Sequence, residues 1–172
     1  MSQGVDPTRR ALLRGRIRPV TASLPLPWAL PWQAFVAGCD RCQACLHACP
    51  QQIIVPGEGG FPTVDVQRNH CTFCRACADA CPKTLFVPAT ERPWSLIATL
   101  SSACLAKQRV FCQSCRDSCE PAALTFSPAP GGIAQPRIDA AACNGCGECV
   151  AACPAGAIAI GQPLAESQEI NG

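Results

Sequence analysis

The chain of 172 residues contains no tyrosine, and only 5% of its residues are aromatic and 15% charged. So few large aromatic side chains argue against a large conventional core, and the length fits one domain or two small ones. The 12 acidic residues form no evident pair, and neither a nucleophile motif nor a glycine-rich phosphate loop occurs. We therefore expect a protein that is not an enzyme.

Two further absences narrow the class of protein. The formal net charge is only +2, which gives no basis for nucleic-acid binding. No apolar run approaches about 18 residues without a proline, so we expect no transmembrane helix.

Cysteine, in contrast, is abundant. Three of the four cysteine sets read C-x2-C-x2-C-x3-C-P without deviation, which is typical of bacterial ferredoxins, where thiolates hold an iron–sulfur cubane. Four sets predict four 4Fe-4S clusters. The sixteen cysteines are Cys39, Cys42, Cys45, Cys49; Cys71, Cys74, Cys77, Cys81; Cys104, Cys112, Cys115, Cys119; and Cys143, Cys146, Cys149, Cys153.

Disulfides and zinc are the alternative uses of so much cysteine. The tight C-x2-C-x2-C repeat disfavours disulfides, because thiols at this spacing are poorly placed to pair. A zinc site would not explain why each set has a third cysteine and a proline. His47 and His70 lie beside the sets, and we interpret them as ordinary surface or packing residues. Clusters would also act as structural staples, so we expect the apo chain to be largely unfolded.

The cysteine sets divide the chain into an α+β arrangement of two tandem, loop-rich ferredoxin units. We expect an N-terminal arm at residues 1–38, a first two-cluster unit at 39–90 and a connector at 91–103. A second two-cluster unit is expected at 104–161 and a polar tail at 162–172. The arm begins with a basic segment. Its uncharged stretch at 20–38 contains three prolines and two tryptophans, which predicts an extended segment rather than a regular helix.

Each unit repeats the same local pattern. Strands are predicted at 53–55 and 61–66 around a glycine-rich turn, and at 122–126 and 133–138 around a second one. A last strand is predicted at 155–160. The apolar stretch at 94–106, with Ser95 as its N-cap, predicts a short helix.

In two-cluster ferredoxins the fourth cysteine of one set ligates the cluster of the other set. This rule predicts Cys39, Cys42, Cys45 and Cys81 for cluster 1, and Cys71, Cys74, Cys77 and Cys49 for cluster 2. It predicts Cys104, Cys112, Cys115 and Cys153 for cluster 3, and Cys143, Cys146, Cys149 and Cys119 for cluster 4. Gly145 and Gly147 suit a tight turn around the cluster.

The third cysteine set departs from the pattern. Cys104 lies eight residues before Cys112 instead of three, and the proline, Pro121, comes one place late. The cluster built on Cys104 is therefore either an ordinary cubane with a looped ligand, a labile cubane, or one that loses an iron to a 3Fe form.

These features together resemble the NapF-type ferredoxins of the periplasmic nitrate reductase system. The resemblance covers residues 8–160 and lies in the start TRRALLRG at 8–15, the segment LPWA at 26–29, and the four cysteine sets in this order. The irregular third set, C-L-A-K at 104–107 followed by C-x2-C-x3-C-E-P at 112–121, is its most specific part.

The resemblance implies a cytoplasmic accessory protein that meets the catalytic subunit of nitrate reductase before export. There it would help to mature that subunit's own 4Fe-4S cluster. A general electron carrier, or an electron-transfer subunit of a larger oxidoreductase, would use the same clusters. Arg9, Arg10, Trp28 and Trp32 in the arm are the candidate contacts with a partner, and a solvated tail is the alternative reading of the arginines.

The N-terminus also resembles two export signals. Arg9 and Arg10 resemble a twin-arginine signal, and residues 36–39 (VAGC) resemble a lipoprotein cleavage box. Three more arginines and several prolines interrupt what would have to be a smooth apolar run. Lipidation of Cys39 would also consume a predicted cluster ligand. We therefore expect a cytoplasmic location.

Overall fold

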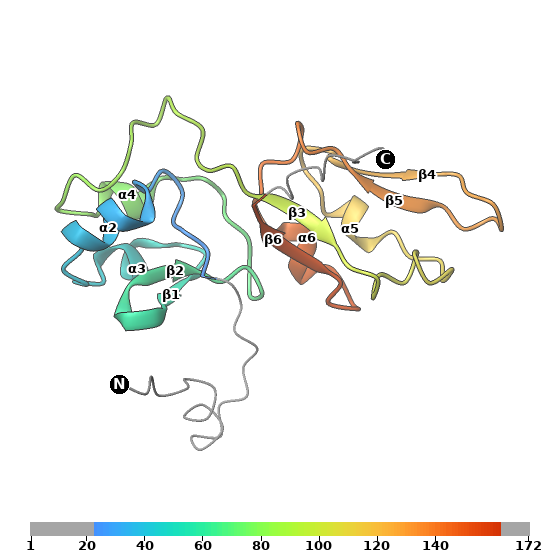
Figure 1. The fold of residues 1–172 in the computed structure, drawn as a ribbon, viewed down its shortest axis with the longest axis horizontal. Coiled ribbons are helices and arrows are strands. Elements are labelled where there is room, and N and C mark those ends of the chain that lie inside the picture. The colour runs from blue at the N-terminus through green and yellow to red at the C-terminus, as the bar shows by residue number, and fades with distance from the viewer. Residues whose placement is uncertain (1–22, 163–172) are drawn as a thin grey trace, which may run out of the picture.

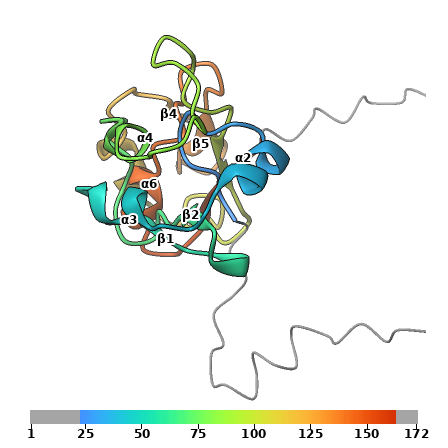
Figure 2. The same ribbon diagram turned by 90° about the vertical axis from the view of Figure 1, so that its left-hand side faces the viewer.

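The computed structural model describes residues 23–162. The two halves of the chain lie side by side along the long axis, with strands β3 and β6 at the junction between them (Figure 1). Viewed from its end, the first half lies in front of the second (Figure 2). Arg9, Arg10 and nearly all of the predicted tail lie outside the described residues.

The secondary structure consists of short pieces separated by loops. The helices are α2 (Trp32–Gly38), α3 (Ala44–Ala48), α4 (Ala76–Asp79), α5 (Ser114–Asp117) and α6 (Glu148–Ala151), with a 3-10 turn η1 (Glu58–Gly60). The strands are β1 (Ile54–Pro56), β2 (Pro62–Val64), β3 (Ile97–Leu100), β4 (Leu124–Ser127), β5 (Gln135–Ile138) and β6 (Ile158–Gly161).

The two predicted hairpins are confirmed. Strand β1 pairs antiparallel with β2, with Ile54 opposite Val64. Strand β4 pairs in the same way with β5, with Leu124 opposite Ile138. Each hairpin turns through two consecutive glycines with positive φ, a conformation that glycine adopts without steric cost.

The prediction of a helix at 94–106 is wrong. Residues Ile97–Leu100 instead form β3, which pairs antiparallel with β6, the predicted last strand. The β-branched residues Ile97 and Thr99 favour a strand once a partner strand is present. Ser95 caps no helix there, and its hydroxyl donates a hydrogen bond to the Gln162 side chain at 3.1 Å.

The first half contains a shorter version of the same pairing. Ala29 forms a β-bridge with Phe86, so the chain before Cys39 lies antiparallel to the chain after Cys81. In the second half β3 precedes Cys104, and β6 follows Cys153. The segment before each unit's first cysteine therefore plays the same structural part in both halves.

The expectation that prolines keep the arm free of helix fails at its end. Helix α2 begins at Trp32, directly after Pro31, and continues to Gly38 without another proline. Proline is well tolerated at the start of a helix, because the first backbone N–H groups have no intrahelical partner there. Phe35 on α2 is buried and packs edge-on against Phe86, with ring centroids 5.9 Å apart.

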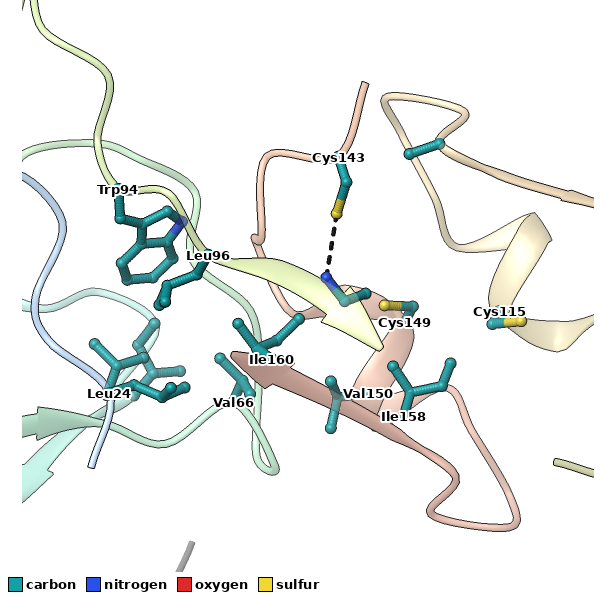
Figure 3. Close-up of a cluster of buried hydrophobic side chains, with 14 of the residues drawn as sticks. Leu24, Val66, Trp94, Leu96, Cys115, Cys143, Cys149, Val150, Ile158 and Ile160 are labelled. Atoms are coloured by element: carbon teal, nitrogen blue, oxygen red, sulfur yellow. Dashed lines mark hydrogen bonds between the residues drawn. The ribbon is translucent and has the colours of Figure 1, made fainter. Parts of the chain in front are cut away.

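One hydrophobic core extends through both halves of the molecule. Leu24, Ile53 and Val66 of the first half pack in the same buried cluster as Val150 and Ile160 of the second. Figure 3 shows Leu24 and Val66 beside Ile160 on β6, with Trp94 and Leu96 above them. The two units therefore share a core although each has its own cysteine sets.

Two buried tryptophans occupy equivalent places beside Phe73, which packs against this shared core. Trp28 and Trp94 each follow a proline, each is at most 8% exposed, and both contact Phe73 edge-on. The indole N–H of Trp28 donates to the Glu91 carbonyl at 2.9 Å, and that of Trp94 donates to the Asn144 carbonyl at 2.8 Å. The polar edge of each buried indole is thus satisfied.

Within residues 23–162, no helix is both long enough and apolar enough to cross a lipid bilayer.

Replacing Gly147 with alanine should destabilise the junction between the halves. The new Cβ would lie 2.6 Å from a methyl carbon of Val66, closer than carbon atoms can approach. Overpacking of this kind costs about 1–3 kcal/mol, which lowers the apparent Tm of a chain this size by roughly 2–12 °C. Anaerobic thermal bleaching of the visible absorption of the loaded protein measures the change.

Gly132→Ala is the matched control. Gly132 also has a positive φ of 81°, but a Cβ there meets no atom within 4 Å. The control therefore carries the backbone cost without the overlap, and the Gly147 variant should melt clearly below it. Equal melting temperatures would contradict the steric interpretation.

Candidate metal centres

The three regular cysteine sets share one backbone conformation. The residues on either side of the second cysteine have positive φ: Arg41 and Gln43, Phe73 and Arg75, and Gly145 and Gly147. Each of these loops leads directly into a single helical turn, α3, α4 or α6. The third cysteine of the set, Cys45, Cys77 or Cys149, therefore lies in the first turn of a helix.

Four pockets of similar size contain all sixteen cysteines, four in each. Their empty volumes, which include space open to solvent, are about 370, 410, 330 and 310 Å³. The pockets are lined by Cys39, Cys42, Cys45 and Cys81; by Cys49, Cys71, Cys74 and Cys77; by Cys104, Cys112, Cys115 and Cys153; and by Cys119, Cys143, Cys146 and Cys149.

Every pocket combines three thiols from one cysteine set with a single thiol from the other set of the same half. The hairpins make this possible, because β1–β2 and β4–β5 return the chain to the first set of each unit. Helices α3 and α4 pack together in the first half, and α5 and α6 do so in the second.

The donor set and the space between the donors fit a multi-atom cluster. Within residues 23–162, no three His, Cys, Asp or Glu side chains are drawn together as ligands of a single metal ion. The four thiols of each pocket surround a space instead. Thiolate sulfur is also the ligand that iron–sulfur clusters require, so the residues present fit such a group.

The raised pKa values of the pocket thiols mean that the thiolates need a compensating positive charge, such as the iron ions of a cluster. Burial, together with the charge of neighbouring thiolates, raises the pKa of the Cys77 and Cys149 thiols to about 12. Burial likewise raises the pKa of Cys45, Cys71 and Cys115 to about 11. Iron ligation requires thiolates, so a metal core must offset this cost and binding releases protons.

Backbone amides point at several of the sulfur atoms. The Phe73 N–H donates to Cys71 Sγ at 3.4 Å, and the Ala157 N–H donates to Cys153 Sγ at 3.3 Å. The Ala98 N–H on β3 donates to Cys143 Sγ at 3.4 Å, and this bond is the dashed line in Figure 3. Hydrogen bonds to ligand sulfur stabilise the reduced, more negative cluster and so tune its reduction potential.

The irregular third set reaches its pocket through an anchored loop. Cys104 is buried with Ala106 and Ala157 in a small apolar cluster of its own. Beyond it the chain turns back, with the Val110 N–H donating to the Leu105 carbonyl at 2.9 Å. The extra residues form a protruding tip at which Phe111 is 74% exposed. Cys104 thus lines the same pocket as Cys112 despite the longer spacing.

The candidate partner residues fall in different environments. Trp28 is only 6% exposed, so its burial fits a packing role and not a surface contact. Trp32 is 50% exposed and lines a broad surface hollow together with Pro31 and Pro93. His47 and His70 line none of the four cysteine pockets.

Sequence reasoning missed Arg75, which lines the pocket of Cys71 and Cys74. Its guanidinium lies over the Trp28 ring at 5.3 Å, donates to the Val87 carbonyl at 2.9 Å and pairs with Asp79 at 3.3 Å. One terminal nitrogen, Nη1, is buried and has no hydrogen-bond partner among residues 23–162. The sequence alone does not distinguish Arg75 from Arg41. Both arginines lie between two cysteines of a set, but Arg41 is exposed.

Comparison with known proteins defines the class. A family model described as a 4Fe-4S dicluster domain matches the chain twice, over residues 38–85 and 108–157. Two dicluster domains imply four 4Fe-4S clusters, which agrees with the four pockets and the sixteen cysteines. The chain is thus an iron–sulfur protein of the ferredoxin type, and the second match begins after Cys104, where the cysteine spacing is irregular.

Curated relatives identify the family. An Escherichia coli protein described as "Ferredoxin-type protein NapF" is 46% identical over 154 residues, which are 90% of this chain and 94% of the relative. A Haemophilus influenzae protein with the same description is 39% identical over 162 residues, 88% of this chain and 92% of the relative. The chain belongs to the NapF family of ferredoxin-type proteins.

Replacing Arg75 with methionine should lower the reduction potential of the cluster in the pocket of Cys71. The guanidinium favours the reduced, more negative state, so its removal should shift the midpoint by tens of millivolts, where about 59 mV is a tenfold change for one electron. Redox titration monitored by electron paramagnetic resonance (EPR) measures it. Arg137→Met on β5 removes an exposed arginine that lines none of the cysteine pockets and should leave every midpoint unchanged; an unshifted Arg75 variant would contradict this role.

Proposed function

We propose that this protein is a cytoplasmic redox accessory of the periplasmic nitrate reductase system. It would act on the catalytic subunit of that enzyme before export and assist the assembly of the subunit's own iron–sulfur cluster. The observation that carries a redox function is the set of four pockets, each lined by four thiols. Membership of the NapF family supports the choice of partner.

The same pockets support the crossover assignment of ligands. In this proposal Cys81 completes cluster 1 and Cys49 completes cluster 2, whereas Cys153 completes cluster 3 and Cys119 completes cluster 4. When bound, a 4Fe-4S cluster supplies one-electron transfer at low potential. The protein's own residues hold the clusters, shield them from water and place two thiols, Cys42 and Cys74, at the surface.

Cysteine is the reactive side chain of the interior. Among residues 23–162, the buried side chains are apolar apart from cysteine. This composition supports a protein that passes electrons to a partner.

The hollow beside Trp32 supports a docking site for the partner. Its empty volume of about 1340 Å³, which includes space open to solvent, is bounded by the arm, by Pro93 and Trp94 of the connector and by Gln162. Trp32 is held there by an edge-on contact with Phe61, with ring centroids 5.9 Å apart. A rigid, half-exposed tryptophan is a typical anchor of a protein interface.

The alternative function is that of a general electron carrier, or of an electron-transfer subunit of a larger oxidoreductase. The exposure of Cys42 and Cys74 favours it, because surface ligands permit electron exchange in brief encounters. A carrier would exchange electrons rapidly with several acceptors and would form no lasting complex with an immature partner.

Replacing Cys81 with alanine tests the crossover. The reconstituted wild-type protein should contain about 16 iron and 16 sulfide per chain, and the variant about four fewer of each. Native alkylation under anaerobic conditions, followed by mass spectrometry, should find Cys39, Cys42 and Cys45 newly reactive. Cys153→Ala is the matched change in the second half and should expose Cys104, Cys112 and Cys115. Labelling of Cys71, Cys74 and Cys77 in the Cys81 variant would overturn the assignment.

An anaerobic pull-down from the native host tests the function. The wild-type protein should retain the catalytic subunit of nitrate reductase in a form that still lacks its cluster. Trp32→Ala should weaken this capture about tenfold or more, as expected for an interface anchor. Phe111→Ala removes another exposed aromatic at the far end and should leave capture intact. Recovery of only the mature enzyme, or recovery of the protein itself from the periplasm, would contradict the proposal.

A further inference from the structure

The cysteine loops of the two halves touch at one point. The backbone N–H of Cys71 donates a hydrogen bond to the carbonyl of Cys146 at 2.8 Å. Cys71 lines the pocket shared with Cys49, and Cys146 lines the pocket shared with Cys119. A single hydrogen bond therefore connects a predicted ligand of cluster 2 to a predicted ligand of cluster 4.

The surrounding packing holds this contact tightly. A Cβ at Gly145 would overlap the Leu96 carbonyl oxygen, and a Cβ at Gly147 would lie 2.6 Å from Val66. The same loop receives hydrogen bonds at the Cys143 and Asn144 carbonyls from the side chains of Arg92 and Trp94. The equivalent positions in the first half carry side chains, so at Gly147 it is the contact with Val66 of the first half that requires glycine, whereas at Gly145 it is the contact with Leu96 of the connector.

Buried apolar side chains lie around part of the contact. Val66, Trp94 and Leu96, which contact the loop, are 5%, 8% and 2% exposed, whereas Cys71 and Cys146 themselves are partly exposed. Water around a redox group must reorganise when its charge changes, and this slows electron transfer. The apolar side chains reduce the amount of water that can reach the loop and so favour exchange through it.

Within each half the two pockets are also neighbours. Helix α3, which contains Cys45, packs against helix α4, which contains Cys77 of the neighbouring pocket. Helix α5 with Cys115 packs in the same way against helix α6 with Cys149.

We propose that the Cys71–Cys146 contact is an electron-exchange junction that joins the two ferredoxin units into one linear chain of clusters, in the order 1, 2, 4, 3. The inference rests on the ligand assignment proposed above. With the clusters bound, the loops of Cys71 and Cys146 would let one electron pass from a reduced cluster 2 to an oxidised cluster 4. The first would be oxidised and the second reduced by one electron, with no bond or proton transferred.

This order differs from the order of the cysteine sets along the sequence. The clusters of the second unit are reversed, so the regular fourth set lies at the centre and the irregular third set at one end. The exposed tip at Val110 and Phe111 adjoins that end. The other end is cluster 1, where Cys42 reaches the surface.

Removal of single clusters tests the order by EPR. A linear chain predicts that Cys42→Ala, which removes cluster 1, leaves three clusters that are all magnetically coupled in the reduced protein. Cys74→Ala, the matched change that removes cluster 2, should leave cluster 1 as one uncoupled spin per chain beside a coupled pair. Photoreduced deazaflavin serves as the one-electron donor.

Two independent units predict a different result. In that case Cys42→Ala would leave cluster 2 as an uncoupled spin, and this outcome would overturn the proposal. Iron analysis and the alkylation pattern of the same samples report separately whether the ligand assignment itself holds. If Cys42→Ala fails to load iron, the fully reduced wild-type spectrum decides: four spins coupled in a row support the junction, and two separate pairs overturn it.

Discussion

The fourth cysteine of each set faces the pocket of the other set, and the remaining architecture follows from this constraint. A hairpin must lie between the sets to bring them together, and a proline directly follows the fourth cysteine of each regular set and turns the chain away. Antiparallel pairing then joins the beginning of each unit to its end, through strands β3 and β6 in the second half and through the Ala29–Phe86 bridge in the first. Four cysteines of the shared core (Cys77, Cys115, Cys143 and Cys149) also line the cluster pockets, so the core and the pockets are built from the same residues. We therefore expect folding and cluster binding to be coupled.

The shared core also connects the two halves energetically. Leu24 and Val66 of the first half pack with Val150 and Ile160 of the second, and Phe73 lies between Trp28 and Trp94. Burial of this kind stabilises by about 25 cal/mol for each Å² of apolar surface removed from water. The two halves are therefore held together by apolar packing as well as by the chain that connects them.

The sequence allowed prediction of the cysteine sets, both hairpins and the composition of all four pockets, because thiol spacing and glycine-rich turns are local signals. The prediction of a helix at the position of β3 is wrong because strand formation there depends on pairing with β6. That strand lies far away in the sequence, so local propensity does not include its effect. Helix α2 was not predicted because the prolines that precede it disfavour a helix, although none lies within residues 32–38. Local sequence patterns do not predict the contact between Cys71 and Cys146 or the position of Arg75. Both depend on tertiary packing.

The close packing at Gly145 and Gly147 bears on how such a protein evolves. Two ferredoxin units with two cysteine sets each are what duplication of one module would produce, although the third set is irregular. The two units are not interchangeable in this molecule. The first unit carries Arg41, Gln43, Phe73 and Arg75 at the turn positions, whereas in the second unit even a Cβ at Gly147 would overlap Val66. Exchange of the two modules would therefore require this loop to change as well.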